Sequence, residues 1–187
     1  TRPPDNRYPL SADRMVRGEA IAALSKIPGL SLPDPAAMTA VYPMDLGPDA
    51  ARGIGRMPPK LTGEPYPDWV SAVDDNGNER GGIQMPDITV PVATHTGFNP
   101  RHEDTGGAGQ LLEYVGSTVP FAKDLAARQA ADDPRPSLGE RYQGRDDYLG
   151  HVRRAAEELA EQHYILPDDI ELCVEIAAAR YDACMAR

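Results

Sequence analysis

Proline is unevenly distributed along this 187-residue chain, and its distribution limits what the first third can form. Twelve of the 19 prolines lie before Trp69. Each proline fixes φ and removes a backbone donor, so this part cannot be mostly regular helix or sheet. The chain also offers few aromatic residues for a core, with one Trp, eight Tyr and two Phe. We therefore expect residues 1–66 to form an irregular segment that wraps around another body.

The second segment, residues 67–99, contains the strongest β signals. The Asn76-Gly77 pair predicts a two-residue type I′ hairpin, because both central positions of that turn need positive φ. Apolar residues alternate with other types over residues 88–92, which indicates a half-buried strand. Pro91 cannot donate a ladder hydrogen bond, so we expect this strand to lie at the edge of a sheet.

The last segment, residues 100–187, begins as a loop and continues as helices. Apolar residues recur at three- and four-residue spacing over residues 148–163, which predicts a helix with one buried face. Pro167 is expected to open a final helix. Shorter helices are expected within residues 11–26 and 122–132. Together the three segments predict an α+β fold with a small hairpin, an edge strand and C-terminal helices.

The charge of the chain narrows the classes of partner. The formal net charge is −10, whereas nucleic-acid backbones and anionic membrane surfaces both attract clustered cations. We therefore expect no nucleic-acid partner and no membrane partner. No run of about 18 apolar residues occurs, so no transmembrane helix is expected. The sequence predicts a soluble chain and leaves its localisation open between cytoplasmic and secreted or periplasmic.

No motif of a complete active site is present. The serine nucleophile elbow, Gly-x-Ser-x-Gly, is absent, and the nearest approach at residues 29–33 ends in proline instead of glycine. The histidines show no spacing typical of a metal site: His95, His102, His151 and His163. The glycine-rich stretches lack the residues of a phosphate-binding loop. We therefore assign no catalytic residue, no metal ligand and no cofactor.

Several short motifs follow one another in a characteristic order. They are Arg7-Tyr8-Pro9, Pro58-Pro59, Pro65-Tyr66-Pro67, Val73-Asp74-Asp75-Asn76-Gly77-Asn78, the stretch Gly82–Asn99, Pro120-Phe121-Ala122 and the stretch Asp133–Tyr142. In this order the chain resembles the C-terminal region of a family of bacterial α/β-hydrolase-domain proteins of the serine-hydrolase type. The resemblance covers essentially the whole chain, and it makes this part an appendage of an α/β-hydrolase fold.

The resemblance also implies where the chemistry lies. In the family, the nucleophile and the catalytic histidine belong to sequence that precedes Thr1 here. The position of His95 is commonly Tyr or Leu in the family, which argues against His95 as the base. His95, Thr96, Phe98 and Asn99 are therefore expected to bind substrate, by lining or covering an active site formed elsewhere.

Three hypotheses of function follow. The first is an accessory C-terminal part of an α/β-hydrolase that cleaves small esters or amides, with the upstream catalytic part or a companion chain as partner. The second is a non-catalytic module that binds a partner through residues 1–66. The third is a self-sufficient enzyme in which His95, after a late strand, works with an acid such as Asp104. The sequence assigns neither a substrate nor an oligomeric state.

Overall fold

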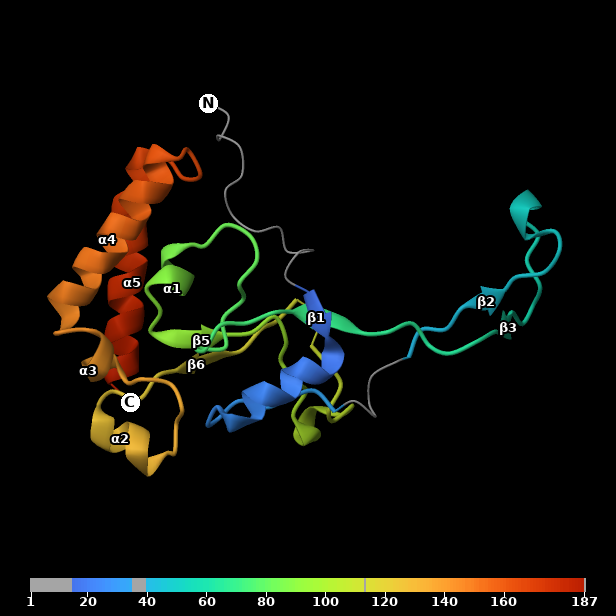
Figure 1. Ribbon diagram of the computed structural model, residues 1–187, viewed down its shortest axis with the longest axis horizontal. Coiled ribbons are helices and arrows are strands. Elements are labelled where there is room, and N and C mark those ends of the chain that lie inside the picture. Colours follow the sequence, from blue (N-terminus) through green and yellow to red (C-terminus); the bar gives the residue numbers. More distant parts are fainter. Residues whose placement is uncertain (1–14, 35–39, 113, 187) are drawn as a thin grey trace.

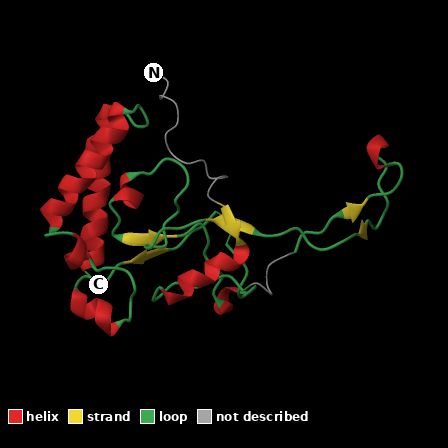
Figure 2. Ribbon diagram, in the orientation of Figure 1, coloured by secondary structure: helices red, strands yellow, loops and turns green. Residues whose placement is uncertain are grey.

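The structure, a computed structural model, describes residues 15–34, 40–112 and 114–186. Figure 1 shows a body of helices and short strands from which a long ribbon projects, and Figure 2 shows the same view by secondary structure. Within these ranges the structure forms three antiparallel strand pairs: β1 (Met15–Arg17) with β4 (Trp69–Ser71), β2 (Met44–Asp45) with β3 (Lys60–Leu61), and β5 (Ala93–His95) with β6 (Thr118–Pro120).

The described helices include two long ones that lie side by side near the C-terminus (Figure 1). The α-helices are α1 (Pro86–Thr89), α2 (Leu125–Ala130), α3 (Leu138–Arg141), α4 (Arg145–Glu161) and α5 (Ile170–Met185). The 3-10 helices are η2 (Gly18–Lys26), η4 (Ala50–Arg52), η5 (Glu103–Thr105) and η6 (Pro167–Asp169). The predicted α+β class is confirmed by these small antiparallel sheets and C-terminal helices.

The core lies where α4 and α5 pack against the β5–β6 pair. Tyr148 and Val152 of α4 are 1% and 0% exposed. The ring of Tyr148 stacks on Tyr181 of α5, with centroids 5.1 Å apart. Val92 before β5 and Phe121 after β6 belong to the same buried cluster, together with Leu138 and Ala177. The helix predicted from the apolar spacing of residues 148–163 is therefore confirmed as α4, except that it ends at Glu161 and leaves out His163, whose φ is +62°. Pro167 begins η6, which continues into α5.

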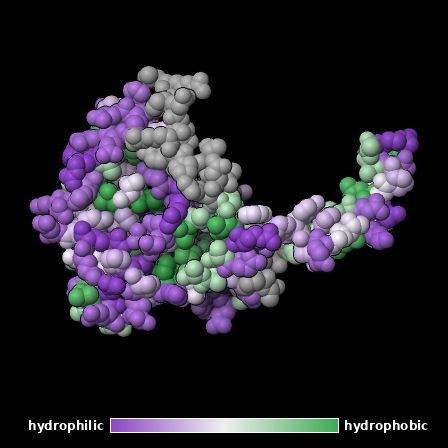
Figure 3. All heavy atoms as spheres, viewed as in Figure 1, coloured by the Kyte–Doolittle hydropathy of each residue, from purple (hydrophilic) through white to green (hydrophobic). Residues whose placement is uncertain are grey.

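Residues 40–67 form the projecting ribbon, which we call the arm (Figure 1). Backbone hydrogen bonds join its two sides beyond the short strands, for example from Tyr66 N to Val41 O at 2.8 Å. Its large apolar side chains are between 45% and 90% exposed: Val41, Met44, Leu46, Ile54, Met57, Leu61 and Tyr66. Figure 3 shows green, hydrophobic atoms at several places on the arm, among purple and white ones. A ribbon of this kind buries almost no side chain of its own.

The strand predicted over residues 88–92 is wrong. Pro86 occupies the first position of α1, where its fixed φ suits a helix and its missing N–H costs no bond. The N–H of Val90 donates to Pro86 O at 2.9 Å, and the strand begins only at Ala93. Val92 belongs to the buried core, and Val90 packs against it. The alternation identified Val90 and Val92 as inward-facing but not Pro91, which is also buried, and five residues are too few to separate one helical turn from a strand.

The turn predicted at Asn76-Gly77 is present, but its loop has three residues instead of two. Gly77 has a φ of +80°, whereas Asn76 has no positive φ, so the turn is not type I′. Asp74 N donates to Asn78 O at 2.8 Å, which closes the longer loop. The carboxylate of Asp74 accepts from the N–H groups of Asn76 and Asn78, both at 2.9 Å. This side-chain bonding favours the longer loop over the tight one.

Other elements differ from the expectations mainly in extent. The helix expected within residues 11–26 is η2, preceded by β1, and residues 11–14 lie outside the described part. The helix expected over residues 122–132 is the shorter α2. The division at residues 66 and 99 stays a prediction, and β1 of the first segment pairs with β4 of the second.

Candidate functional site

A cavity of about 310 Å³ lies between the β1–β4 pair, η2, the turn after β4 and the loop after β5. It therefore adjoins the place where the arm returns to the body through β4. Figure 3 shows hydrophobic surface on the body close to this junction. A cavity of this size falls at the small end of the range for small-molecule pockets, roughly 300–1,000 Å³.

Three of the four predicted site residues line this cavity. They are His95, Thr96 and Phe98. Asn99 is not among the lining residues, and its carbonyl oxygen accepts a hydrogen bond from Leu112 N at 2.9 Å. The structure thus brings together the first three and leaves Asn99 in backbone pairing beside them. Their role in substrate binding stays a prediction.

The side chain of Asn78 fixes the backbone that presents His95. Asn78 is 0% exposed. Its Oδ1 accepts from His95 N at 2.7 Å, and its Nδ2 donates to Ala93 O at 3.1 Å. Both bonds go to β5, so the turn after β4 is attached to this strand by one buried amide. The sequence signal for this residue was the Asn that follows Gly77, which we interpreted only as part of a turn.

The loop after β5 is held by its own hydroxyl groups. Thr96 Oγ1 donates to Phe98 O at 2.7 Å and accepts from Ser117 N at 3.1 Å. Ser117 Oγ also donates to Phe98 O, at 3.1 Å. Across the pair, a Cβ on Gly116 would lie 2.0 Å from Thr96 O, so this close approach requires glycine. The wall of the cavity formed by this loop is therefore fixed in position.

The surroundings of His95 favour its neutral imidazole. Burial lowers its pKa; Asp87 opposes this and Arg180 adds to it. Its Nδ1 lies 3.1 Å from Thr118 Oγ1 on β6. Asp104 pairs instead with His102, at 3.3 Å, and in the part of the chain that the structure describes no carboxylate lies within ion-pair distance of His95. The His95–Asp104 pairing of the third hypothesis is therefore not formed.

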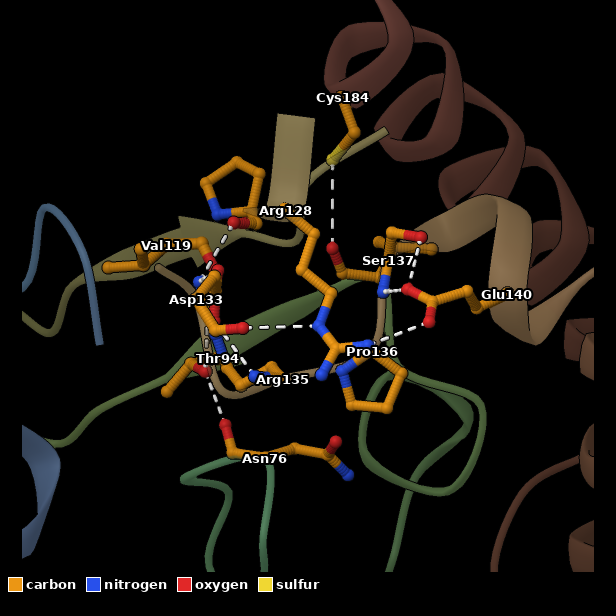
Figure 4. A network of polar contacts seen from close by, with 12 residues as sticks. Asn76, Thr94, Val119, Arg128, Asp133, Arg135, Pro136, Ser137, Glu140 and Cys184 are labelled. Carbon is orange, nitrogen blue, oxygen red and sulfur yellow. Dashed lines mark hydrogen bonds and ion pairs between the residues drawn. The ribbon is translucent and has the colours of Figure 1, made fainter. Parts of the chain in front are cut away.

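A buried ion pair supports the strands that carry the site (Figure 4). Arg135 is 1% exposed and donates to Asp133 through Nε at 2.9 Å and Nη2 at 2.7 Å. The same guanidinium donates to Thr94 Oγ1 at 2.7 Å and to Val119 O at 3.0 Å. The Thr94 hydroxyl in turn donates to Asn76 O. Arg135 thereby connects β5, β6 and the turn in one network.

Sequence reasoning did not identify the role of this network. Arg135 and Asp133 belong to the stretch Asp133–Tyr142, which entered the argument only as a family motif. The one signal in the sequence was that Arg135 stands between two prolines. Prolines restrict the backbone there, but they do not indicate which residue Arg135 contacts.

A second cavity, of about 260 Å³, lies beside α1 and α4. Its wall includes His151, whose Nδ1 lies 2.9 Å from Arg154 Nη2. None of the four predicted site residues lines it. Across the described residues, no group of three or more His, Cys, Asp or Glu side chains could hold a metal ion. No helix in that part of the chain has the length and apolar character to cross a bilayer.

Comparison with known proteins identifies the family. The family model described as Alpha/beta hydrolase domain matches residues 31–175. This range includes the arm, the turn after β4, the loop with His95, the Arg135 network and α4. Neither the curated proteins nor the solved structures contain a match. Because the family match spans well over half of the chain, the chain belongs to the alpha/beta hydrolase domain family.

Proposed function

We propose that this chain is the C-terminal accessory part of an α/β-hydrolase that cleaves carboxylic esters or amides. In this proposal it shapes or covers an active site whose nucleophile lies upstream of Thr1. The main support is the cavity that gathers His95, Thr96 and Phe98 in a chain of the alpha/beta hydrolase domain family. The absence of a Gly-x-Ser-x-Gly elbow from the 187 residues is consistent with a nucleophile housed elsewhere.

The exposed surface supports a covering role. Much apolar surface lies on the arm, and apolar patches of this kind mark contact sites. We assign the arm to contact with the catalytic part of the same protein or of a companion chain.

The chemistry of the cavity fits binding better than proton transfer. A general base needs a pKa near the working pH and gains from an oriented acid partner. His95 has a lowered pKa and contacts a threonine hydroxyl. In our proposal it therefore lines the substrate site as a neutral hydrogen-bonding group, while Phe98 supplies apolar contact.

The first test compares the full-length protein with the 187-residue chain. We expect the sequence encoded before Thr1 to contain Gly-x-Ser-x-Gly and a later histidine. The full-length protein is then expected to hydrolyse a short-chain p-nitrophenyl ester, and the 187-residue chain to be inactive. An upstream sequence without both features would contradict the hydrolase proposal and favour the partner-binding module. Activity of the isolated chain that is lost in His95→Ala would favour the self-sufficient enzyme.

A second prediction concerns Phe98 in the full-length protein. Phe98→Ala is expected to raise KM for an ester about tenfold and to change kcat by less than about threefold. The reason is that a wall contact of this size binds ground state and transition state alike. Steady-state kinetics with an ester series measures both constants. Leu166→Ala is the matched control, because Leu166 is apolar, 66% exposed and absent from the cavity wall. An unchanged KM in Phe98→Ala would remove this residue from the substrate site.

A further inference from the structure

The cavity beside Trp69 has one apolar side built from segments far apart in the sequence. Ile21 and Leu24 come from η2, Val16 from β1, Trp69 from β4 and Phe98 from the loop after β5. Trp69 is 54% exposed, so the space opens to solvent at its side. At roughly 30 Å³ per water-sized group, a volume of about 310 Å³ accommodates on the order of ten methylene-sized groups.

The polar side chains that line the cavity disfavour an anionic ligand. Glu79 and His95 both line the space. Burial lowers the pKa of His95, which favours the uncharged imidazole, and Glu79 adds a carboxylate that belongs to none of the ion pairs among the described residues. The whole chain has a formal net charge of −10. A carboxylate ligand would be repelled by Glu79 inside the cavity, because the guanidinium of Arg17 lies over the Trp69 ring and is not among the lining residues, whereas an uncharged group meets no such repulsion.

We infer that this cavity binds an uncharged aliphatic chain of about eight to ten carbons, such as the acyl or alkyl chain of an ester. The assignment of that chain to a substrate rests on the proposed function. The binding itself requires only the residues that line the cavity. We choose an uncharged aliphatic chain as the ligand because of the size of the cavity, its apolar wall and the carboxylate of Glu79 among its lining residues.

Trp69 makes the inference measurable. It is the one tryptophan of the chain, and it forms part of the cavity wall. A bound aliphatic chain displaces water from the indole ring, so its fluorescence is expected to shift to shorter wavelength. The guanidinium of Arg17 lies 5.4 Å from the ring centroid on a strand that also lines the space, so the reporter is held in a defined environment.

The experiment is a titration of the 187-residue chain at pH 7 with 1-octanol, 1-butanol and octanoate. We expect a saturable shift of Trp69 emission with 1-octanol, with at least tenfold weaker binding of 1-butanol and of octanoate. Octanoate binding as tight as that of 1-octanol would overturn the charge argument. A complete lack of saturable change with 1-octanol would overturn the inference as a whole.

Filling the cavity provides the matched variants. A Cβ on Gly97 would meet only Glu79 Oε1 within 4 Å, at 3.6 Å, and Gly97 has no left-handed φ. Gly97→Leu is therefore expected to fold and to weaken 1-octanol binding at least tenfold. Ala20→Leu, in the wall formed by η2, is a second filling variant with the same expected result. Gly55→Leu on the arm is the control, because a Cβ there meets nothing within 4 Å.

The outcomes separate this inference from the proposed function. Wild-type affinity for 1-octanol in both filling variants would overturn the inference. Emission that shifts with protein concentration alone would also overturn it, because a second copy would then occupy the cavity. Saturable 1-octanol binding without ester hydrolysis by the full-length protein would leave the inference standing and contradict the proposed function. Ester hydrolysis by the full-length protein without saturable 1-octanol binding would support the proposed function and overturn the inference.

Discussion

Arg135→Met is expected to lower the free energy of unfolding by about 3–5 kcal/mol, because it leaves a buried carboxylate without its partner. Arg135 is 1% exposed, and the side chain of Asp133 is 4% exposed. The substitution also removes the donors to Thr94 Oγ1 and Val119 O, so β5 and β6 lose their shared support. Urea unfolding followed by circular dichroism measures the change.

The control for Arg135 is an arginine in an exposed pair. Arg153 bonds with Glu171 through both Nη atoms, and these side chains are 41% and 68% exposed. Exposed pairs contribute little because water screens them, so Arg153→Met is expected to leave the urea midpoint nearly unchanged. A similar shift of the midpoint in Arg135→Met and Arg153→Met would contradict the buried network.

The stability difference between wild type and Arg135→Met is also expected to depend on pH. Burial alone would raise the pKa of Asp133, but its hydrogen bonds and ion pair with Arg135 outweigh this and hold the pKa below the usual 3.8. In the wild type, the ionised Asp133 therefore stabilises the fold at pH values above 3.8. This contribution is lost as the pH falls through the lower pKa that Asp133 has in the folded state. In Arg135→Met the buried carboxylate instead has a raised pKa, and protonation relieves it. The difference should therefore narrow between pH 7 and pH 3, and an equal difference at both would contradict the charge argument.

Asn78→Ala is the second substitution with a large expected effect, a loss of about 2–4 kcal/mol in the free energy of unfolding. The variant leaves His95 N and Ala93 O without their partners in a buried place, and each orphaned group costs about 1–3 kcal/mol. Asn78 is 0% exposed, so water cannot replace the amide without structural change.

Asp75→Ala is the matched control for Asn78, because Asp75 belongs to the same turn and is exposed. It is expected to change stability by less than about 0.5 kcal/mol. Asn78→Ala is further expected to weaken 1-octanol binding, since the wall with His95 and Phe98 depends on the same attachment. A loss of less than about 1 kcal/mol in Asn78→Ala would contradict the role given to this side chain.

The helices of the last third could be predicted because their signal is local. The three- and four-residue spacing in α4 and the proline at the start of η6 act within one or two turns. The same locality explains the error over residues 88–92. Apolar alternation there matched a strand, while Pro86 as the first residue of α1 decided the outcome. Over five residues, a strand and a single helical turn can show the same apolar pattern, so the pattern alone does not give the backbone conformation.

The site could be predicted only in part. His95, Thr96 and Phe98 lie within four residues, so a single loop brings them to one wall. The opposite wall comes from Ile21 and Trp69, which no local pattern joins to this loop. The bond from Arg135 to Thr94 likewise spans 41 residues. Contacts between residues so far apart in the sequence depend on how the whole chain packs. Neither periodicity nor motif spacing predicts them.

The arm has a consequence for how the protein is made. Its strands β2 and β3 pair only with each other in the described part, so both outer edges keep open N–H and C=O groups beside exposed apolar side chains. Open edges of this kind are templates for pairing with other copies and for aggregation. A newly synthesised chain therefore gains from covering the arm early. Under the proposed function, the soluble yield of the chain is expected to rise when the proposed catalytic part is produced in the same cell.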